Sequence, residues 1–310
     1  MTIITTPEKK KRKFSLLDNI ITILIGAHLL LVAGEIVGGL LKYGVMFPGM
    51  EALIPGITAT DAWITAQQYL GFVGIWIAVL FFLAVIPRNR PILKALGTKV
   101  KGNTLKMFSV GLAIGLGMNL FCAAIAMLNG DIALRFHSFR PVSFLLLFIA
   151  VLIQSAAEEL VCRVFIYQRM VRRYGKPILA GVVNAAYFAL IHLGNPGLTP
   201  LAIVNICLYG LLFSAMILYM DSPWAAMAAH ASWNFCQNII LGLPNSGIVL
   251  PYSVFKLDAA TAVDSFAYSV SFGLESTITA SIILAVVAGA IIWWGIKHKV
   301  VPTDIWNTAA

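Results

Sequence analysis

Three short segments of the sequence place ionisable side chains inside long apolar stretches, where such groups are rare. Residues 158–163 read Glu-Glu-Leu-Val-Cys-Arg, residues 188–192 read Phe-Ala-Leu-Ile-His, and residues 230–234 read His-Ala-Ser-Trp-Asn. A charged side chain in the hydrocarbon of a bilayer is disfavoured by about 2.5 to 3.5 kcal/mol, so each one is by default a functional group or its partner. A carboxylate in such a place is a candidate general base, and its convergence with two histidines is the strongest indication of function.

The two adjacent glutamates cannot share one role. On a helix, Glu158 and Glu159 point about 100° apart. Glu159 and Arg163 are separated by four residues, the spacing at which a carboxylate and a guanidinium meet on one helix face, so we predict an ion pair. Glu158 is then left without a partner and is the candidate reactive carboxylate. The alternative is that both glutamates only hold helices together through Arg163.

The histidines lie on stripes of their own. Phe188 and His192 are predicted to share a helix face, as are His230 and Asn234, and Asn184 extends the first stripe by one turn. A single membrane histidine is more often a helix–helix hydrogen-bonding residue than a catalytic one. Two histidines and a glutamate on successive helices with short connections favour a common polar site.

The composition indicates an all-α polytopic membrane protein. Hydrophobic residues make up 60% of the chain, charged residues 11%, and the mean hydropathy is +0.89. We expect a basic tail over residues 1–17, then one membrane domain over residues 18–310 whose motif-bearing core covers about 142–243. Apolar runs long enough to span a bilayer predict eight helices, at about 18–41, 64–86, 107–129, 142–168, 178–193, 201–220, 223–243 and 277–296. The stretches 42–63 and 244–276 are predicted to be outward-facing loops.

The distribution of charge predicts the orientation. If the N-terminus is cytoplasmic and the chain crosses the membrane eight times, 17 of the 22 lysines and arginines lie on the cytoplasmic side. Since cytoplasmic segments of membrane proteins are rich in lysine and arginine, this count predicts that both termini are cytoplasmic. The net charge of +9 is therefore read as a topology signal with secondary contact to anionic lipid, and a nucleic-acid partner is not expected.

Helix lengths raise one difficulty. Counting about 1.5 Å per residue from the cytoplasmic ends puts Glu158 about 16 Å deep, His192 about 22 Å and His230 about 10 Å, although a shared site needs them level. The boundaries of the helix at 178–193 are the weakest, and we expect the discrepancy to arise there.

The series EExxxR, FxxxH and HxxxN, in this order, resembles the CAAX protease and bacteriocin-processing (CPBP) family of intramembrane peptidases. This family is also called the Abi or type II CAAX prenyl endopeptidase-like family. All three motifs match without substitution, over about 142–243. The resemblance implies peptide-bond hydrolysis within or near the membrane, in a multi-pass protein of a bacterial cytoplasmic membrane.

By motif position, the resemblance implies that Glu158 and His192 activate a water molecule, and that His230 and Asn234 stabilise the oxyanion. Glu159, Arg163 and Phe188 would support them. Members of the family have also been described as metal-dependent metalloproteases, and Glu158, His192 and His230 could form a three-ligand zinc site. The sequence lacks HExxH, and using Glu158 as a ligand would remove the obvious base, so no cofactor is favoured and zinc stays an alternative.

The expected partner is a membrane-associated peptide or protein substrate, and prenylated CAAX-type proteins are one candidate class. Two other functions remain open. The first is a non-proteolytic role in bacteriocin immunity or as a membrane scaffold. The second is a proton-coupled transporter that uses Glu158, His192 and His230 as a relay.

Overall fold

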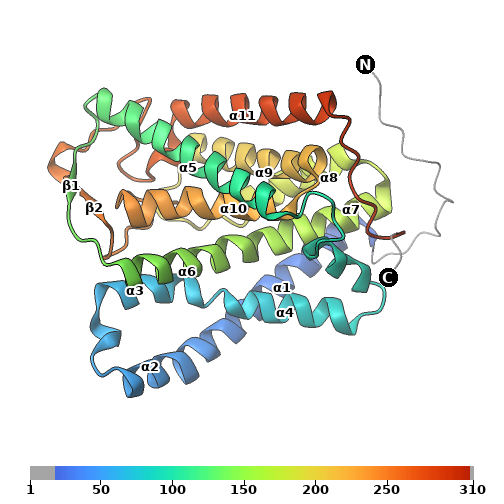
Figure 1. Ribbon diagram of the computed structural model, residues 1–310, viewed down its shortest axis with the longest axis horizontal. Coiled ribbons are helices and arrows are strands. Elements are labelled where there is room, and N and C mark those ends of the chain that lie inside the picture. Colours follow the sequence, from blue (N-terminus) through green and yellow to red (C-terminus); the bar gives the residue numbers. More distant parts are fainter. Residues whose placement is uncertain (1–17, 308–310) are drawn as a thin grey trace.

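The structure, a computed structural model, describes residues 18–307, so the basic tail predicted over residues 1–17 lies outside the described residues. The described chain is mainly helical, as the composition predicts, with one two-stranded antiparallel ribbon (Figure 1). The α-helices are α1 (Ile20–Leu41), α2 (Phe47–Leu53), α3 (Asp61–Leu70), α4 (Val73–Val85), α5 (Leu105–Leu128), α6 (Pro141–Glu159), α7 (Tyr167–Tyr174), α8 (Pro177–Leu190), α9 (Pro200–Met220), α10 (Pro223–Phe235) and α11 (Ile278–Lys297).

Shorter elements join or extend these helices. The strands are β1 (Leu134–Phe136) and β2 (Phe255–Leu257). Segments with π-helical hydrogen bonding occupy Lys42–Met46, Leu160–Ile166 and Cys236–Ile240, and 3₁₀ turns occupy Ile57–Ala59, Arg90–Leu96, Ala259–Thr261 and Leu274–Ser276.

Six helical stretches among residues 18–307 are long and apolar enough to cross a membrane: Ile20–Leu53, Asp61–Val85, Leu105–Leu128, Pro141–Tyr174, Pro200–Met220 and Ile278–Lys297. The other two predicted spans are also helical, but α8 has only 14 residues and α10 has 13 before its π-helical extension. An integral membrane protein is therefore supported, and the count of eight spans and the cytoplasmic location of both termini stay predictions.

The stretch at 42–63 is not the loop that we predicted. The helix that begins as α1 continues through Lys42–Met46 and α2 to Leu53. Pro48 does not end it. The π-helical segment Lys42–Met46 comes just before this proline, and such a local change of hydrogen bonding lets a membrane helix accommodate a residue without an N–H. The predicted span 64–86 corresponds to the stretch Asp61–Val85, in which α3 and α4 meet at a turn over residues 71–72.

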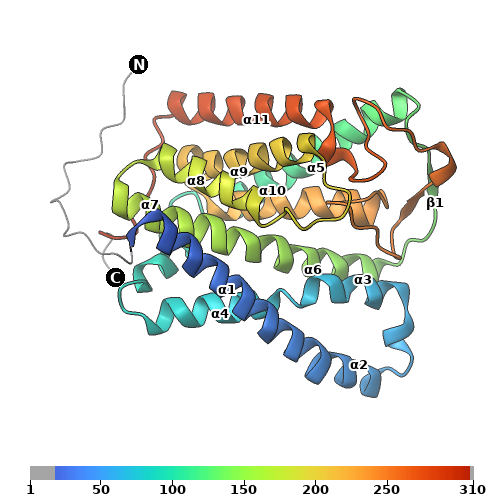
Figure 2. The ribbon, with the colours of Figure 1, turned by 180° about the vertical axis from the view of Figure 1, so that it is seen from behind.

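α10 lies at the centre of the helical layers. It packs against α5 and α6, and almost every residue of α10 is buried. Figure 1 shows α11 along one edge, α6 below α10, and α1 to α4 along the opposite edge. Seen from the other side in Figure 2, α1 runs obliquely across α4. A site on α10 is thus surrounded by helices.

Small residues allow α5 to approach α10 closely. A Cβ atom added to Gly111 would lie 2.3 Å from the carbonyl oxygen of Ala225, and one added to Gly115 would lie 2.0 Å from that of Ala229. Small residues at such spacing are typical of tightly packed membrane helices. This packing holds α10 in place from the side opposite its reactive face.

Candidate active site

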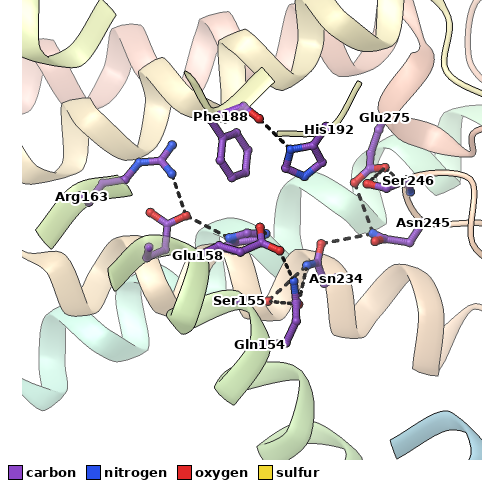
Figure 3. Close-up of polar contacts among 12 residues, drawn as sticks. Gln154, Ser155, Glu158, Arg163, Phe188, His192, Asn234, Asn245, Ser246 and Glu275 are labelled. Atoms are coloured by element: carbon purple, nitrogen blue, oxygen red, sulfur yellow. Dashed lines mark hydrogen bonds and ion pairs between the residues drawn. The ribbon is translucent and has the colours of Figure 1, made fainter. Parts of the chain in front are cut away.

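The structure brings the four predicted catalytic side chains to one cavity of about 380 Å³. Glu158 lies near the end of α6, His192 in the turn after α8, and Asn234 on α10 (Figure 3). His230 lies on α10, one turn before Asn234. The four side chains meet at this cavity although their counted depths differ, and α8 ends at Leu190, two residues before His192. His192 is therefore not on the helix as predicted, and depth cannot be counted through the helix to its position.

Glu159 and Arg163 form the ion pair that their spacing predicts. Nη1 of Arg163 donates to Oε1 of Glu159 at 3.0 Å, and the two side chains are 0% and 1% exposed. Nδ1 of His230 lies 3.0 Å from the same carboxylate oxygen, and Nη2 of Arg163 donates to the carbonyl oxygen of Gly210 on α9 at 3.2 Å. The pair thus joins α6, α9 and α10 and fixes the His230 ring.

Two aromatic rings surround this pair. The guanidinium of Arg163 lies 4.6 Å from the ring centre of Phe188 and 5.2 Å from that of Phe213. The His230 ring stacks on Phe213 at 5.2 Å and meets Phe188 edge-on at 5.9 Å. Cation–π contacts at desolvated sites contribute about 2 kcal/mol, which offsets part of the cost of burying Arg163. Phe188 therefore supports the site as a packing residue rather than as a reactive group.

Glu158 takes a different direction from Glu159, toward the cavity. Its side chain is 12% exposed. Oε1 accepts a hydrogen bond from Nε2 of Gln154 at 2.5 Å, whereas Oε2 is buried and has no hydrogen-bond partner within the described part of the chain. Nε2 of His230 lies 3.8 Å from Oε2. A buried carboxylate oxygen without a partner is costly, and a water molecule in the cavity would satisfy it.

His192 is held by the backbone of its own segment. Its Nδ1 lies 2.7 Å from the carbonyl oxygen of Phe188, and the two rings are 4.6 Å apart. Because a carbonyl oxygen only accepts hydrogen bonds, Nδ1 carries the hydrogen. In the neutral imidazole this leaves Nε2 without a hydrogen, so it can accept a hydrogen bond or a proton.

Asn234 is tied to side chains that the motif analysis missed. Its Nδ2 donates to Oγ of Ser155 at 3.2 Å and to Oε1 of Gln154 at 3.4 Å, and its Oδ1 accepts from Nδ2 of Asn245 at 3.2 Å. Gln154 could have been found from sequence, since it is a polar residue one turn before Glu158 in an apolar stretch.

Glu275 is a further cavity residue that the motif analysis missed. It bonds Asn245 and Ser246, and burial raises the pKa of its carboxyl to about 7. Neither Asn245 nor Glu275 belongs to a motif, and both lie in the irregular connection between α10 and α11.

The zinc alternative requires three ligands around one point. Within residues 18–307, no group of three histidine, cysteine, aspartate or glutamate side chains is arranged to hold a metal ion. Glu158, His192 and His230 share the cavity, but as they stand they do not fit a three-ligand zinc site.

The chain is similar to a known protease family over the part that builds this site. The model of the type II CAAX prenyl endopeptidase Rce1-like family matches residues 140–236, a segment that begins just before α6 and ends just after α10 and contains all three motifs. The match confirms the resemblance drawn from the motifs and supports a membrane-embedded protease of the CAAX type. A search of curated proteins found no match.

Proposed function

We propose that the protein is an intramembrane endopeptidase that hydrolyses a peptide bond of a membrane-associated protein or peptide with water activated by Glu158 and His192. The arrangement of two acceptors around the cavity carries this proposal. Oε2 of Glu158 has no hydrogen-bond partner among residues 18–307, Nε2 of His192 is left as an acceptor, and both side chains line the same cavity. Two acceptors around one space are what a nucleophilic water requires.

In the first step, the water donates one hydrogen bond to Glu158 and the other to His192. Its oxygen attacks the carbonyl carbon of the scissile bond while one proton passes to the Glu158 carboxylate. The carbonyl π electrons move to the oxygen and give a tetrahedral intermediate. When the intermediate collapses, the C–N bond breaks and the protonated Glu158 returns a proton to the leaving nitrogen.

The oxyanion of the intermediate needs hydrogen-bond donors. Glu159 holds Nδ1 of His230, so in the imidazolium form Nε2 is the donor available to the cavity. Asn234 supplies the second donor by exchanging one of its long bonds, to Ser155 or Gln154, for the oxyanion. Donors held in advance in a dry site stabilise developing charge strongly.

The proposed substrate is a peptide segment delivered by the membrane. The cavity also has apolar walls that include Leu31, Phe72, Ile75 and Phe213, which suits a partly apolar segment. A prenylated CAAX-type protein is one such substrate. No observation within the described residues favours the immunity, scaffold or proton-coupled transport functions.

The test is cleavage of a membrane-tethered peptide library by the detergent-purified full chain. The wild type is compared with Glu158→Gln, with His192→Ala, and with His137→Ala, which changes an exposed histidine before α6 and serves as the control. We expect cleavage by the wild type and the control, and none by the two site variants while their thermal melts stay native. Cleavage that survives Glu158→Gln would overturn the mechanism, and a wild type that cleaves nothing would overturn the proposed function.

A further inference from the structure

Glu275 is a buried carboxylate at the catalytic cavity that accepts several hydrogen bonds from one turn of the chain. It lies in the 3₁₀ turn Leu274–Ser276 before α11, is 6% exposed, and lines the catalytic cavity. Its Oε2 accepts from the backbone N–H of Ser246 at 2.6 Å and from Oγ of Ser246 at 3.1 Å, and its Oε1 accepts from Nδ2 of Asn245 at 3.3 Å. Both carboxylate oxygens are therefore used as acceptors (Figure 3).

The turn that supplies these donors is held in an uncommon conformation. Ser246 has a φ of 50°, in the left-handed region, which costs a non-glycine residue about 1–2 kcal/mol. Gly247 follows with a φ of 80°, and a Cβ there would lie 1.9 Å from the carbonyl oxygen of Pro196. Asn245 also pairs with Gly273 in an antiparallel bridge. The turn is thus fixed between the segment after His192 and the segment before Glu275.

A chain of hydrogen bonds connects this turn to Asn234 in the active site, and the donor and the acceptor of each bond can be assigned. Nδ2 of Asn245 donates both to Oε1 of Glu275 and to Oδ1 of Asn234, at 3.3 and 3.2 Å. Since a carboxylate only accepts, the amino group of Asn245 must face Glu275, and the same amino group then meets the carbonyl of Asn234. The amino group of Asn234 is left to point toward Oγ of Ser155 and Oε1 of Gln154, both on α6.

We propose that Glu275 is a positioning residue that acts through Asn245 to determine which end of the Asn234 amide faces the scissile bond. This inference rests on the proposed function of the site. With Glu275 ionised, Asn234 presents N–H donors where the oxyanion forms. Without that carboxylate the amide can turn and present a carbonyl oxygen, which repels the developing negative charge.

The nearly isosteric change Glu275→Gln should reverse the chain of hydrogen bonds. The backbone N–H of Ser246 can only donate, so the oxygen of the introduced glutamine faces Ser246 and its amino group faces Asn245. Asn245 must then present its carbonyl oxygen, and Asn234 turns its own amino group toward Asn245 and away from the site. Loss of one oxyanion donor lowers kcat by about 10² to 10³, and KM should change little because the peptide's other contacts remain.

The test is a double-mutant cycle on a fluorogenic peptide chosen from those that the wild-type full chain cleaves. The variants are Glu275→Gln, Asn234→Ala and the double variant, with Asp264→Asn as a control for an exposed carboxylate in the same connection. We expect each single variant to lose about 10² to 10³ in kcat and the double variant to lose no more than either, because both remove the same donor. The control should match the wild type.

Unchanged kcat in Glu275→Gln, or losses that multiply in the double variant, would overturn the inference. If Glu275→Gln does not fold, Asn245→Ala, which removes the same donor to Asn234, takes its place in the cycle with the same two outcomes. Failure of the proposed function looks different. In that case the wild type cleaves no peptide, or Glu158→Gln retains activity, before Glu275 is ever changed.

Discussion

Replacing Arg163 by methionine should be among the most damaging changes to stability. Arg163 is 0% exposed, and its loss would leave the Glu159 carboxylate, 1% exposed, with only His230 as a partner. Removing one member of a buried ion pair costs about 3–5 kcal/mol, because the remaining charge is uncompensated. The change also removes the bond to Gly210 and the contacts with two aromatic rings. We therefore expect a loss of stability at the upper end of that range.

The double variant Glu159→Gln/Arg163→Met removes both charges and should be more stable than Arg163→Met alone. Arg135→Met is the matched control, because Arg135 pairs with Asp258 while 79% exposed, and a surface pair contributes about 0–1 kcal/mol. The free energy of unfolding of these three variants is measured by reversible unfolding in mixed micelles with a denaturing detergent. A loss below about 1 kcal/mol in Arg163→Met, or a double variant less stable than that single variant, would refute the reasoning.

Three further predictions concern packing, proton binding and metal. Gly115→Ala should lower the free energy of unfolding by about 1–3 kcal/mol, because the added methyl group overpacks against Ala229. Gly117→Ala is the control, since a Cβ at Gly117 meets no neighbouring atom, and it should leave the stability unchanged. Equal losses in the two variants would contradict the close approach of α5 to α10. Burial holds the pKa of Glu275 at about 7, above its ordinary value of 4.5. The folded chain thus binds that proton more tightly than the unfolded chain does. As the pH rises from about 5 to 8, the free energy of unfolding of the wild type should therefore fall by up to about 3 kcal/mol relative to that of Glu275→Gln. A difference in melting that does not change with pH would contradict this assignment. Chelation should leave cleavage unchanged, whereas loss of turnover that zinc restores would contradict water activation without a metal.

Local spacing predicted those parts of the site that depend on one helix. The separation of Glu159 and Arg163 by four residues predicted their ion pair, and the angle between adjacent helix positions predicted that Glu158 points elsewhere. Spacing failed for His192, because α8 ends two residues earlier and the histidine is held by a turn. It failed again at 42–63, where the helix continues past Pro48 because a π-helical segment just before the proline accommodates it.

The contacts around Asn234 could not be predicted in the same way. Asn245 and Glu275 are 30 residues apart and meet only because the connection between α10 and α11 folds back over the cavity. Neither carries a periodic or motif signal, and a glutamate in a connection is ordinarily solvated. Only the tertiary structure reveals that Glu275 is buried and that its hydrogen bonds lead to the active site.

The central claim is that Glu158 accepts the proton of the attacking water. The most direct test is the single-turnover cleavage rate of Glu158→Gln against the wild type, on one peptide that the wild type cleaves, with equal thermal melts as a condition. Loss of a general base predicts a fall of about 10² to 10⁴ in that rate, because glutamine retains the shape and the bond to Gln154 but cannot take a proton. A rate within a few-fold of the wild type would contradict the account.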